Sequence, residues 1–194
     1  MNKEIALSNL IEIRDQLKKN DCNFWIQDGT LLGYYRHNDF ICHDMDTDLG
    51  IMMNSFSPKT LIEILKLNFE IQHVFGYVED SLEICLIKNN VKTDLFFHYP
   101  RGNKQYHCAF LYKVLRIDYE YNRFKTKEVD FLGEKFNVPE HEIEYIKTKY
   151  GENWIIPDEK WDWAYSPKNH KKTNITIDPK ISVNKFNKWI RSHE

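Results

Sequence analysis

The segment HDMDTDLGIMM, residues 43–53, constrains the fold of this chain more than any other stretch. Aspartate occupies every second position at 44, 46 and 48, and an apolar run follows directly. Because side chains alternate across a strand, the three aspartates should point to one side and the apolar residues after them to the other. The segment therefore predicts a strand that is anchored in a core and carries a convergent acidic group.

Such an acidic group predicts a metal site. Carboxylates that converge on one side repel one another, and each resists ionising unless a cation neutralises the set. Oxygen ligands suit Mg²⁺, with Mn²⁺ as the nearest substitute, and Mg²⁺ in proteins is usually shared between carboxylates and substrate phosphates. We therefore expect a phosphorylated substrate. On spacing alone, residues 44–48 are equally well explained as a solvated acidic turn.

A further carboxylate lies later in the chain, in VKTDLFFHY, residues 91–99. Asp94 is surrounded there by apolar residues typical of a buried strand, where an unpaired carboxylate would be costly. It is a candidate for the third ligand of a two-metal clamp or for the general base of phosphoryl transfer. An exposed structural aspartate is the alternative.

Hydrophobic periodicity predicts a domain of mixed α/β (α+β) class, with a small mixed sheet, helices mainly on one face and a loop-rich helical C-terminal part. The predicted helices cover residues 3–19, 57–68, 141–151 and 183–192, and a short one follows Gly29. The predicted strands cover residues 22–27, 46–53, 69–78, 81–89, 91–100 and 135–139. Residues 69–100 should form an antiparallel meander, whereas much of 105–138 has no clear period.

Domain organisation and composition narrow the function classes. We expect a catalytic domain over residues 1–157, with an extension over 158–194 packed on it. The net charge of -2 provides no basic field, so a nucleic-acid partner is not expected. Four dispersed cysteines suit reduced thiols, and no apolar run approaches the ~20 residues of a membrane span. These features favour a cytoplasmic protein without a membrane span.

The run from Trp25 to Ile51 closely resembles the signature of the LicD/fukutin-related family, which has the nucleotidyltransferase fold. The matching residues are Gly29, Thr30, Leu31, Leu32, Gly33, Arg36, His37, Phe40, Ile41, Asp44, Asp46, Asp48 and Gly50. The segment around Asp94 resembles the family's later strand with a single aspartate, and residues 136–157 resemble its closing segment. The resemblance therefore covers most of the chain.

This resemblance implies a metal-dependent transferase. It would move a substituted phosphate, such as phosphocholine, ribitol phosphate or glycerol phosphate, from a CDP-linked donor to a hydroxyl of a glycan or glycolipid. Cell-surface or capsular polysaccharide would be the setting. Two alternatives remain: a nucleotidyltransferase of the same fold that uses ATP on a small molecule, and a non-catalytic binding module.

The resemblance also assigns candidate metal ligands. Asp46, Asp48 and Asp94 would bind the metal and carry the chemistry, and Asp44 would support them or contact substrate. Three residues depart from the family pattern: Cys42, His43 and Met45. Met45 should lie on the opposite strand face, so the metal site should remain intact, whereas His43 is a position where substrate selectivity could differ.

Four more residues are candidates for substrate binding. Gly29 and Thr30 lie where the N–H groups of a helix N-terminus could hold a donor phosphate. Arg36 offers a planar fork for a phosphate, with a surface ion pair as its alternative. His37 is a candidate for donating to the pyrophosphate or moving a proton, although a structural histidine is as common.

Overall fold

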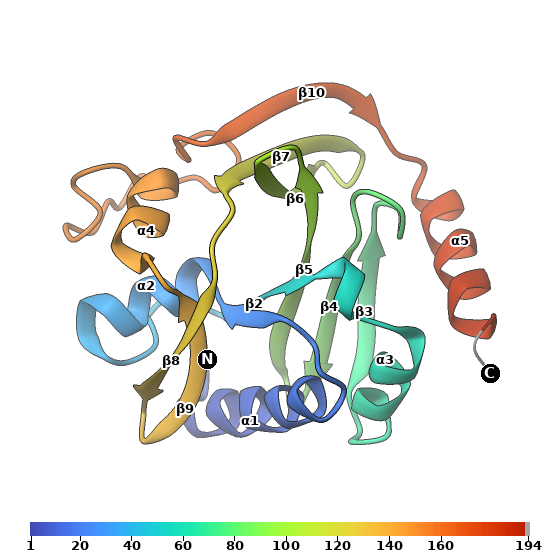
Figure 1. Cartoon of the computed structure of the whole chain (residues 1–194), viewed down its shortest axis with the longest axis horizontal. Helices are drawn as coiled ribbons and strands as arrows, with labels where there is room; N and C mark the ends of the chain where they lie inside the picture. The colour runs from blue at the N-terminus through green and yellow to red at the C-terminus, as the bar shows by residue number, and fades with distance from the viewer. Residues whose placement is uncertain (193–194) are drawn as a thin grey trace.

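The strand that begins at the aspartates lies next to the centre of a mixed sheet. In the computed structural model, which describes residues 1–192, β2 (Asp46–Met52) pairs with β1 (Phe24–Ile26) in the antiparallel sense (Figure 1). On its other side β2 runs parallel to β5 (Val91–Arg101). Parallel strands need a crossover connection, and the chain between β2 and β5 supplies it with a helix and a hairpin. The parallel pair is what sets two acidic strands side by side.

The expected meander over residues 69–100 is confirmed. β3 (Glu70–Phe75) pairs with β4 (Glu83–Lys88), and β4 pairs with the first half of β5, all antiparallel. Asn89 and Asn90 join β4 to β5, and both have positive φ angles, 51° and 60°. A two-residue hairpin turn of type I′ requires this backbone conformation, which asparagine tolerates better than most residues.

Residues 105–138, much of which has no clear periodicity, include strands that extend the sheet. β6 (Lys104–Leu111) pairs with the second half of β5, and β7 (Leu115–Asn122) pairs with β6. β10 (His170–Thr176) then pairs with β7, so part of the tail that we expected to be loop is a strand. Among residues 1–192 this sheet has eight strands and is larger than predicted. β8 (Thr126–Phe131) and β9 (Glu134–Pro139) form a separate two-stranded sheet.

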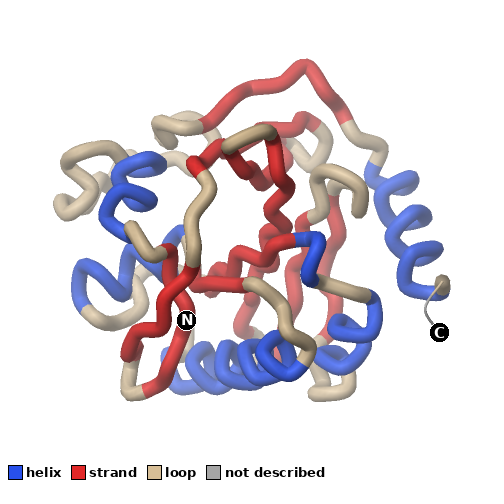
Figure 2. The backbone as a smooth tube through the Cα atoms, viewed as in Figure 1, coloured by secondary structure: helices blue, strands red, loops and turns tan. Residues whose placement is uncertain are grey.

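Helices lie along the outer side of the strands (Figure 2). α1 (Lys3–Lys19) contacts β2 and β5, and its Leu10, Ile13 and Leu17 are fully buried. Figure 1 shows α1 and α3 (Pro58–Leu65) along one side of the strands, with a short 3₁₀ helix, η1 (Met53–Ser55), leading into α3. α1 covers the predicted residues, whereas α3 begins one residue after the predicted start and ends at Leu65, three residues before the predicted end.

The remaining helices lie at the edges. α2 (Asp28–His37) contacts β2, α4 (Glu142–Tyr150) contacts β7 and β9, and α5 (Pro179–Arg191) contacts β3 and α3. α5 starts earlier than expected because Asp178 accepts hydrogen bonds at its N-terminus and Pro179 suits the first helical position. No helix within the described residues is both long and apolar enough to cross a membrane.

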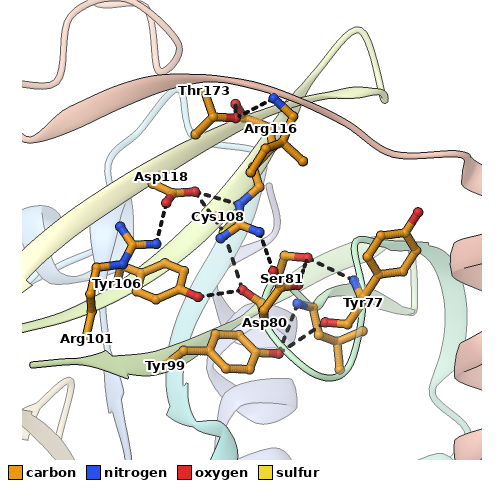
Figure 3. Close-up of polar contacts among 12 residues, drawn as sticks. Tyr77, Asp80, Ser81, Tyr99, Arg101, Tyr106, Cys108, Arg116, Asp118 and Thr173 are labelled. Atoms are coloured by element: carbon orange, nitrogen blue, oxygen red, sulfur yellow. Dashed lines mark hydrogen bonds and ion pairs between the residues drawn. The ribbon is translucent and has the colours of Figure 1, made fainter.

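A partly buried ion-pair network links β5, β6 and β7 and the loop before β4 (Figure 3). Asp118 accepts from Arg101 at 2.7 Å and from Arg116 Nε at 2.7 Å. Arg116 also donates to Asp80 Oδ2 at 2.6 Å, and Asp80 accepts from Ser81 Oγ at 2.8 Å. The two arginines hold the pKa of Asp118 below its usual range despite the opposing effect of burial. The network fixes the loop of residues 76–82 on the face opposite the acidic residues.

Gly76 begins this loop and has no room for a side chain. Its φ is +72°, and a Cβ there would lie 1.9 Å from the backbone oxygen of Ser81. Gly102 also has a positive φ of +59°, but nothing lies within 4 Å of the place its Cβ would take. Substituting each glycine by alanine therefore distinguishes the cost of a positive φ from the added cost of steric overlap.

We predict that Gly76→Ala lowers the free energy of unfolding by about 3 kcal/mol or more, because overlap adds to the strain of a positive φ. Gly102→Ala is the matched control and should lower it by only about 1 kcal/mol. Urea denaturation followed by circular dichroism measures both. Equal losses of unfolding free energy in the two variants would show that the backbone shifts enough to remove the overlap with Ser81 at little cost.

Candidate active site

A cleft of about 1110 Å³ opens on the sheet face that carries the aspartates. Its floor is formed by side chains of β2, β5, β6 and neighbouring strands, and its walls by the N-terminus of α2, the end of α4 and residues 153–168. The acidic residues Asp28, Asp44, Asp46, Asp48, Glu83 and Asp94 all line it. The cleft is therefore the place where the sequence-predicted ligands meet.

Strand register brings the predicted ligands together. Asp48 on β2 lies directly beside Asp94 on β5, and Asp46 is two positions before Asp48 on the same face. Carboxylate oxygens of Asp44, Asp46 and Asp48 lie within 4.8 Å of one another. Asp44 joins the group from a turn rather than from the strand, because β2 begins only at Asp46. The expected alternation therefore holds for two of the three aspartates, and the third reaches the group differently.

The N-terminus of α2 binds Asp48. The backbone N–H of Gly29 donates to Asp48 Oδ2 at 2.9 Å, and that of Thr30 donates to the same atom at 3.4 Å. In return, the backbone N–H of Asp48 donates to Thr30 Oγ1 at 2.8 Å. The N–H groups expected to hold a donor phosphate thus hold a protein carboxylate, which fills the role of a helix cap.

Gly29 also allows Asp44 to approach. A Cβ at Gly29 would lie 2.3 Å from Asp44 Oδ2 and 3.2 Å from Asp48 Oδ2. Its place in the site is therefore steric: the absence of a side chain lets two carboxylates pack against the first turn of α2.

The carboxylates carry shifted pKa values, as expected for like charges in a partly buried cluster. Burial, reinforced by the charge of Asp46, raises the pKa of Asp44 to about 7. Burial raises the pKa of Asp94 to about 6, and burial with four neighbouring carboxylates raises that of Asp48 well above its usual range. Asp94 Oδ1 is buried and has no hydrogen-bond partner within the described part of the chain. A buried carboxylate oxygen without a partner, beside like charges, fits a cation site, and oxygen donors fit a hard divalent metal.

Arg36 contacts the closing segment of the domain. Its guanidinium donates to the carbonyl oxygen of Trp154, at 2.8 Å from Nε, and to that of Ile156 at 3.3 Å. Arg36 lines the cleft, but in this structure its donors hold residues 154–156 against α2. The phosphate contact expected for it stays a prediction.

The structure does not bring His37 to the site. Its side chain is exposed in the last turn of α2 and does not line the cleft. Met45 is 67 % exposed, consistent with its absence from the acidic cluster, whereas His43 does line the cleft.

Sequence reasoning missed a buried cation. Lys149 on α4 is 6 % exposed, and its Nζ lies 2.5 Å from Asp28 Oδ1 and 5.0 Å from the centre of the Tyr119 ring. Both Lys149 and Asp28 line the cleft. A signal was present, because Tyr145, Ile146 and Lys149 share one buried helix face, where a lysine is unusual.

Two buried histidines were also missed, His98 beneath the cleft and His107 on its floor. His98 Nε2 donates to Gln27 Oε1 at 2.9 Å, and His107 packs on Tyr119 with ring centres 4.9 Å apart. Burial lowers the pKa of both imidazoles well below the usual value, so both are neutral. Neither ring nitrogen of His107 has a hydrogen-bond partner among residues 1–192, and this histidine lines the cleft.

Comparison with known sequences identifies relatives of this chain. Residues 21–141 match the family model described as LicD/FKTN/FKRP, nucleotidyltransferase domain. The proteins named "Ribitol-5-phosphate transferase FKTN" of Mus musculus and of Homo sapiens are each 34 % identical to this chain over 161 residues. These matches cover 82 % of this chain and 35 % of each relative, so the chain spans about a third of their length.

A bacterial relative is more distant. The "Uncharacterized protein RT0683" of Rickettsia typhi is 27 % identical over 191 residues, which cover 92 % of this chain and 58 % of that protein. Among solved structures, the lincomycin-bound lincosamide antibiotic adenylyltransferase LnuA is similar with a TM-score of 0.48 and 12 % identity. The match covers 76 % of this chain and 92 % of LnuA.

The family model spans the whole segment that builds the acidic site, from the approach to β1 through β2 and β5 to the start of α4. The chain belongs to the LicD/FKTN/FKRP nucleotidyltransferase domain family.

Proposed function

We propose that this domain transfers a substituted phosphate from a CDP-activated donor to a hydroxyl of a glycan or glycolipid, with Mg²⁺ as the metal. The observation that carries the proposal is the side-by-side pairing of Asp48 and Asp94 on parallel strands, with Asp46 on the same face. Family membership supports the class of reaction, and the name of the FKTN relatives supports ribitol 5-phosphate as one transferred group.

The donor set supports magnesium over zinc in the carboxylate cluster. Asp46, Asp48 and Asp94 offer only oxygen ligands, which Mg²⁺ and Mn²⁺ prefer. Bound there, the cation would neutralise charge that develops on the donor phosphates during transfer. Asp44 would complete the group from its turn, and Gly29 leaves the space that this packing needs.

The protein residues then position and activate the reactants. The acceptor hydroxyl attacks the phosphorus that carries the substituent, its oxygen forms the new phosphodiester bond, and the bond to CMP breaks. A carboxylate accepts the hydroxyl proton, and Asp94, with its pKa raised to about 6, is suited to that role as well as to ligation. Lys149 is placed to balance phosphate charge from the end of α4.

The cleft has room for two substrates. A volume of about 1110 Å³ exceeds what a single small ligand needs, and aromatic residues form part of its wall. Tyr150 and Trp161 pack with ring centres 4.6 Å apart there. We assign this wall to a nucleoside or sugar ring, because both stack on aromatic faces.

We predict that Mg²⁺ stabilises this domain more at high pH than at low pH. Burial raises the pKa values of Asp44 to about 7 and of Asp94 to about 6, so the metal-free folded state holds more protons than the unfolded chain below those values. Its stability should therefore fall as pH rises toward 7, and a cation should offset that loss. Differential scanning calorimetry should show a rise in Tm of about 5 °C with Mg²⁺ near pH 8 and little rise near pH 5.5.

Asp46→Asn should abolish most of this Mg²⁺ effect. Asp130→Asn is a matched control, because Asp130 lies in the separate β8–β9 sheet with a 71 % exposed side chain and should leave the effect unchanged. An equal rise in Tm at both pH values would contradict ionised carboxylates as the ligands.

We predict metal-dependent release of CMP when the protein is given a CDP-linked polyol or choline together with a glycan acceptor. Asp46→Asn and Asp94→Asn should each lower kcat by about 100-fold or more, because each removes a charge that holds the metal or the proton. Chromatography of the nucleotide product measures the release. Asp130→Asn should retain the activity of the unmodified protein.

The released nucleotide distinguishes the alternatives. Pyrophosphate release from ATP would assign a nucleotidyltransferase acting on a small molecule. Absence of turnover together with absence of metal-dependent nucleotide binding would assign a non-catalytic binding module.

A further inference from the structure

A second group of possible metal ligands lies beside the carboxylate cluster. His73 on β3 pairs with Cys85 on β4, and Cys85 pairs with Asp94 on β5, whose parallel neighbour on β2 is Asp48. Residues opposite one another in a sheet point to the same face. The row therefore runs across four adjacent strands on the cleft face, from nitrogen and sulfur donors to oxygen donors.

The three side chains of this row converge. One ligand atom each of His73, Cys85 and Asp94 lies within 4.8 Å of the others. A tetrahedral metal with ligand distances of ~2.0–2.3 Å holds its ligands about 3.5 Å apart, so movements of about 1 Å would close the shell. Rotamer adjustment at His73, whose side chain is 32 % exposed, can supply part of that movement.

An independent observation points to a cation at the same place. Glu83, adjacent to this row on β4, is 8 % exposed, and its Oε2 has no hydrogen-bond partner within the described residues. Its Oε1 lies 3.8 Å from His73 Nε2. Asp94 Oδ1 is likewise buried without a partner. Among residues 1–192, each carboxylate therefore keeps one buried oxygen without a hydrogen-bond partner beside His73, and a bound cation would satisfy these oxygens.

We propose that His73, Cys85 and Asp94 bind a thiophilic divalent cation of the Zn²⁺ class, with Glu83 orienting His73. Imidazole, thiolate and carboxylate together are donors that select zinc over magnesium, which avoids sulfur. A carboxylate behind a ligating histidine fixes the ring and raises its basicity. On binding, the Cys85 thiol loses its proton to solvent and its sulfur forms the bond to the metal.

The cation can reach this site from the cleft. His73, Glu83 and Asp94 line the cleft, while Cys85 lies beneath them with no exposed surface. Three protein ligands leave the fourth tetrahedral position open toward the cleft. The site therefore adjoins the carboxylate cluster without replacing it.

Asp94 links the two sites. A cation held by His73 and Cys85 would compete for the carboxylate of Asp94, which is also a ligand in the proposed Mg²⁺ site. This consequence rests on the proposed function: Zn²⁺ should inhibit CMP release, and His73→Gln should weaken that inhibition. Metal binding itself does not depend on the transfer reaction.

The test is a Co²⁺ titration of the purified protein, without donor or acceptor, followed by absorption. Co²⁺ takes zinc sites and gives a thiolate-to-metal charge-transfer band only when sulfur is a ligand. We expect the band to saturate at one Co²⁺ per chain. Cys85→Ser should abolish the band, and His73→Gln should raise the apparent Kd at least about tenfold.

Cys42→Ser is the matched control, because Cys42 is the exposed cysteine and its Sγ lies 3.9 Å from His43 Nδ1, close to Asp44. It should leave the band unchanged. His73→Gln keeps the test valid if Cys85→Ser fails to fold, since His73 is on an edge strand and partly exposed.

Three results would overturn the proposal: no thiolate band in the unmodified protein, a band that survives Cys85→Ser, or a band that is lost in Cys42→Ser. Because no substrate is present, these results are independent of whether CMP is ever released. A protein that binds Co²⁺ through Cys85 but shows no transfer would retain this site and lose the proposed function.

Discussion

The acidic site depends on a reciprocal set of hydrogen bonds between β2 and α2. Asp48 accepts from the backbone N–H groups at the start of the helix, while its own N–H donates to Thr30 Oγ1. The positive end of the helix dipole faces the carboxylate and offsets part of the repulsion from its acidic neighbours. This contact fixes the helix start, the strand start and one metal-ligand candidate together. Without this contact, the other carboxylates would not be held at fixed positions relative to α2.

The same cleft is lined by acidic, neutral and basic side chains. Carboxylates on β2 and β5 have raised pKa values because they are buried beside like charges, whereas His107 on the floor is held neutral by burial. Lys149 introduces a positive charge from α4 and is balanced by Asp28 at the start of α2. Positive and negative groups therefore meet where the ends of two helices face the sheet.

Strand alternation predicted that Asp46 and Asp48 share one strand face, because a local pattern encodes which face a strand residue takes, and the structure places Asp94 beside Asp48. Their roles as metal ligands stay predictions. Other features could not be predicted in this way. β10 has mostly exposed side chains, and its place in the sheet is set by backbone pairing with β7, which no apolar pattern reports. The contact of Arg36 with the carbonyl of Trp154 joins distant segments, as does the pair of Lys149 and Asp28. Such contacts depend on tertiary packing, and sequence spacing does not encode it.

The parallel pairing of β2 with β5 also has a kinetic consequence. α3 and the β3–β4 hairpin lie between these strands in the chain, and the hairpin can form from local contacts alone. Pairing of β2 with β5 closes a much longer loop and should come later in folding. The aspartates would then approach one another only after most of the apolar surface is buried. Assembly of the charged centre late in folding would keep its repulsion from opposing the early collapse of the chain.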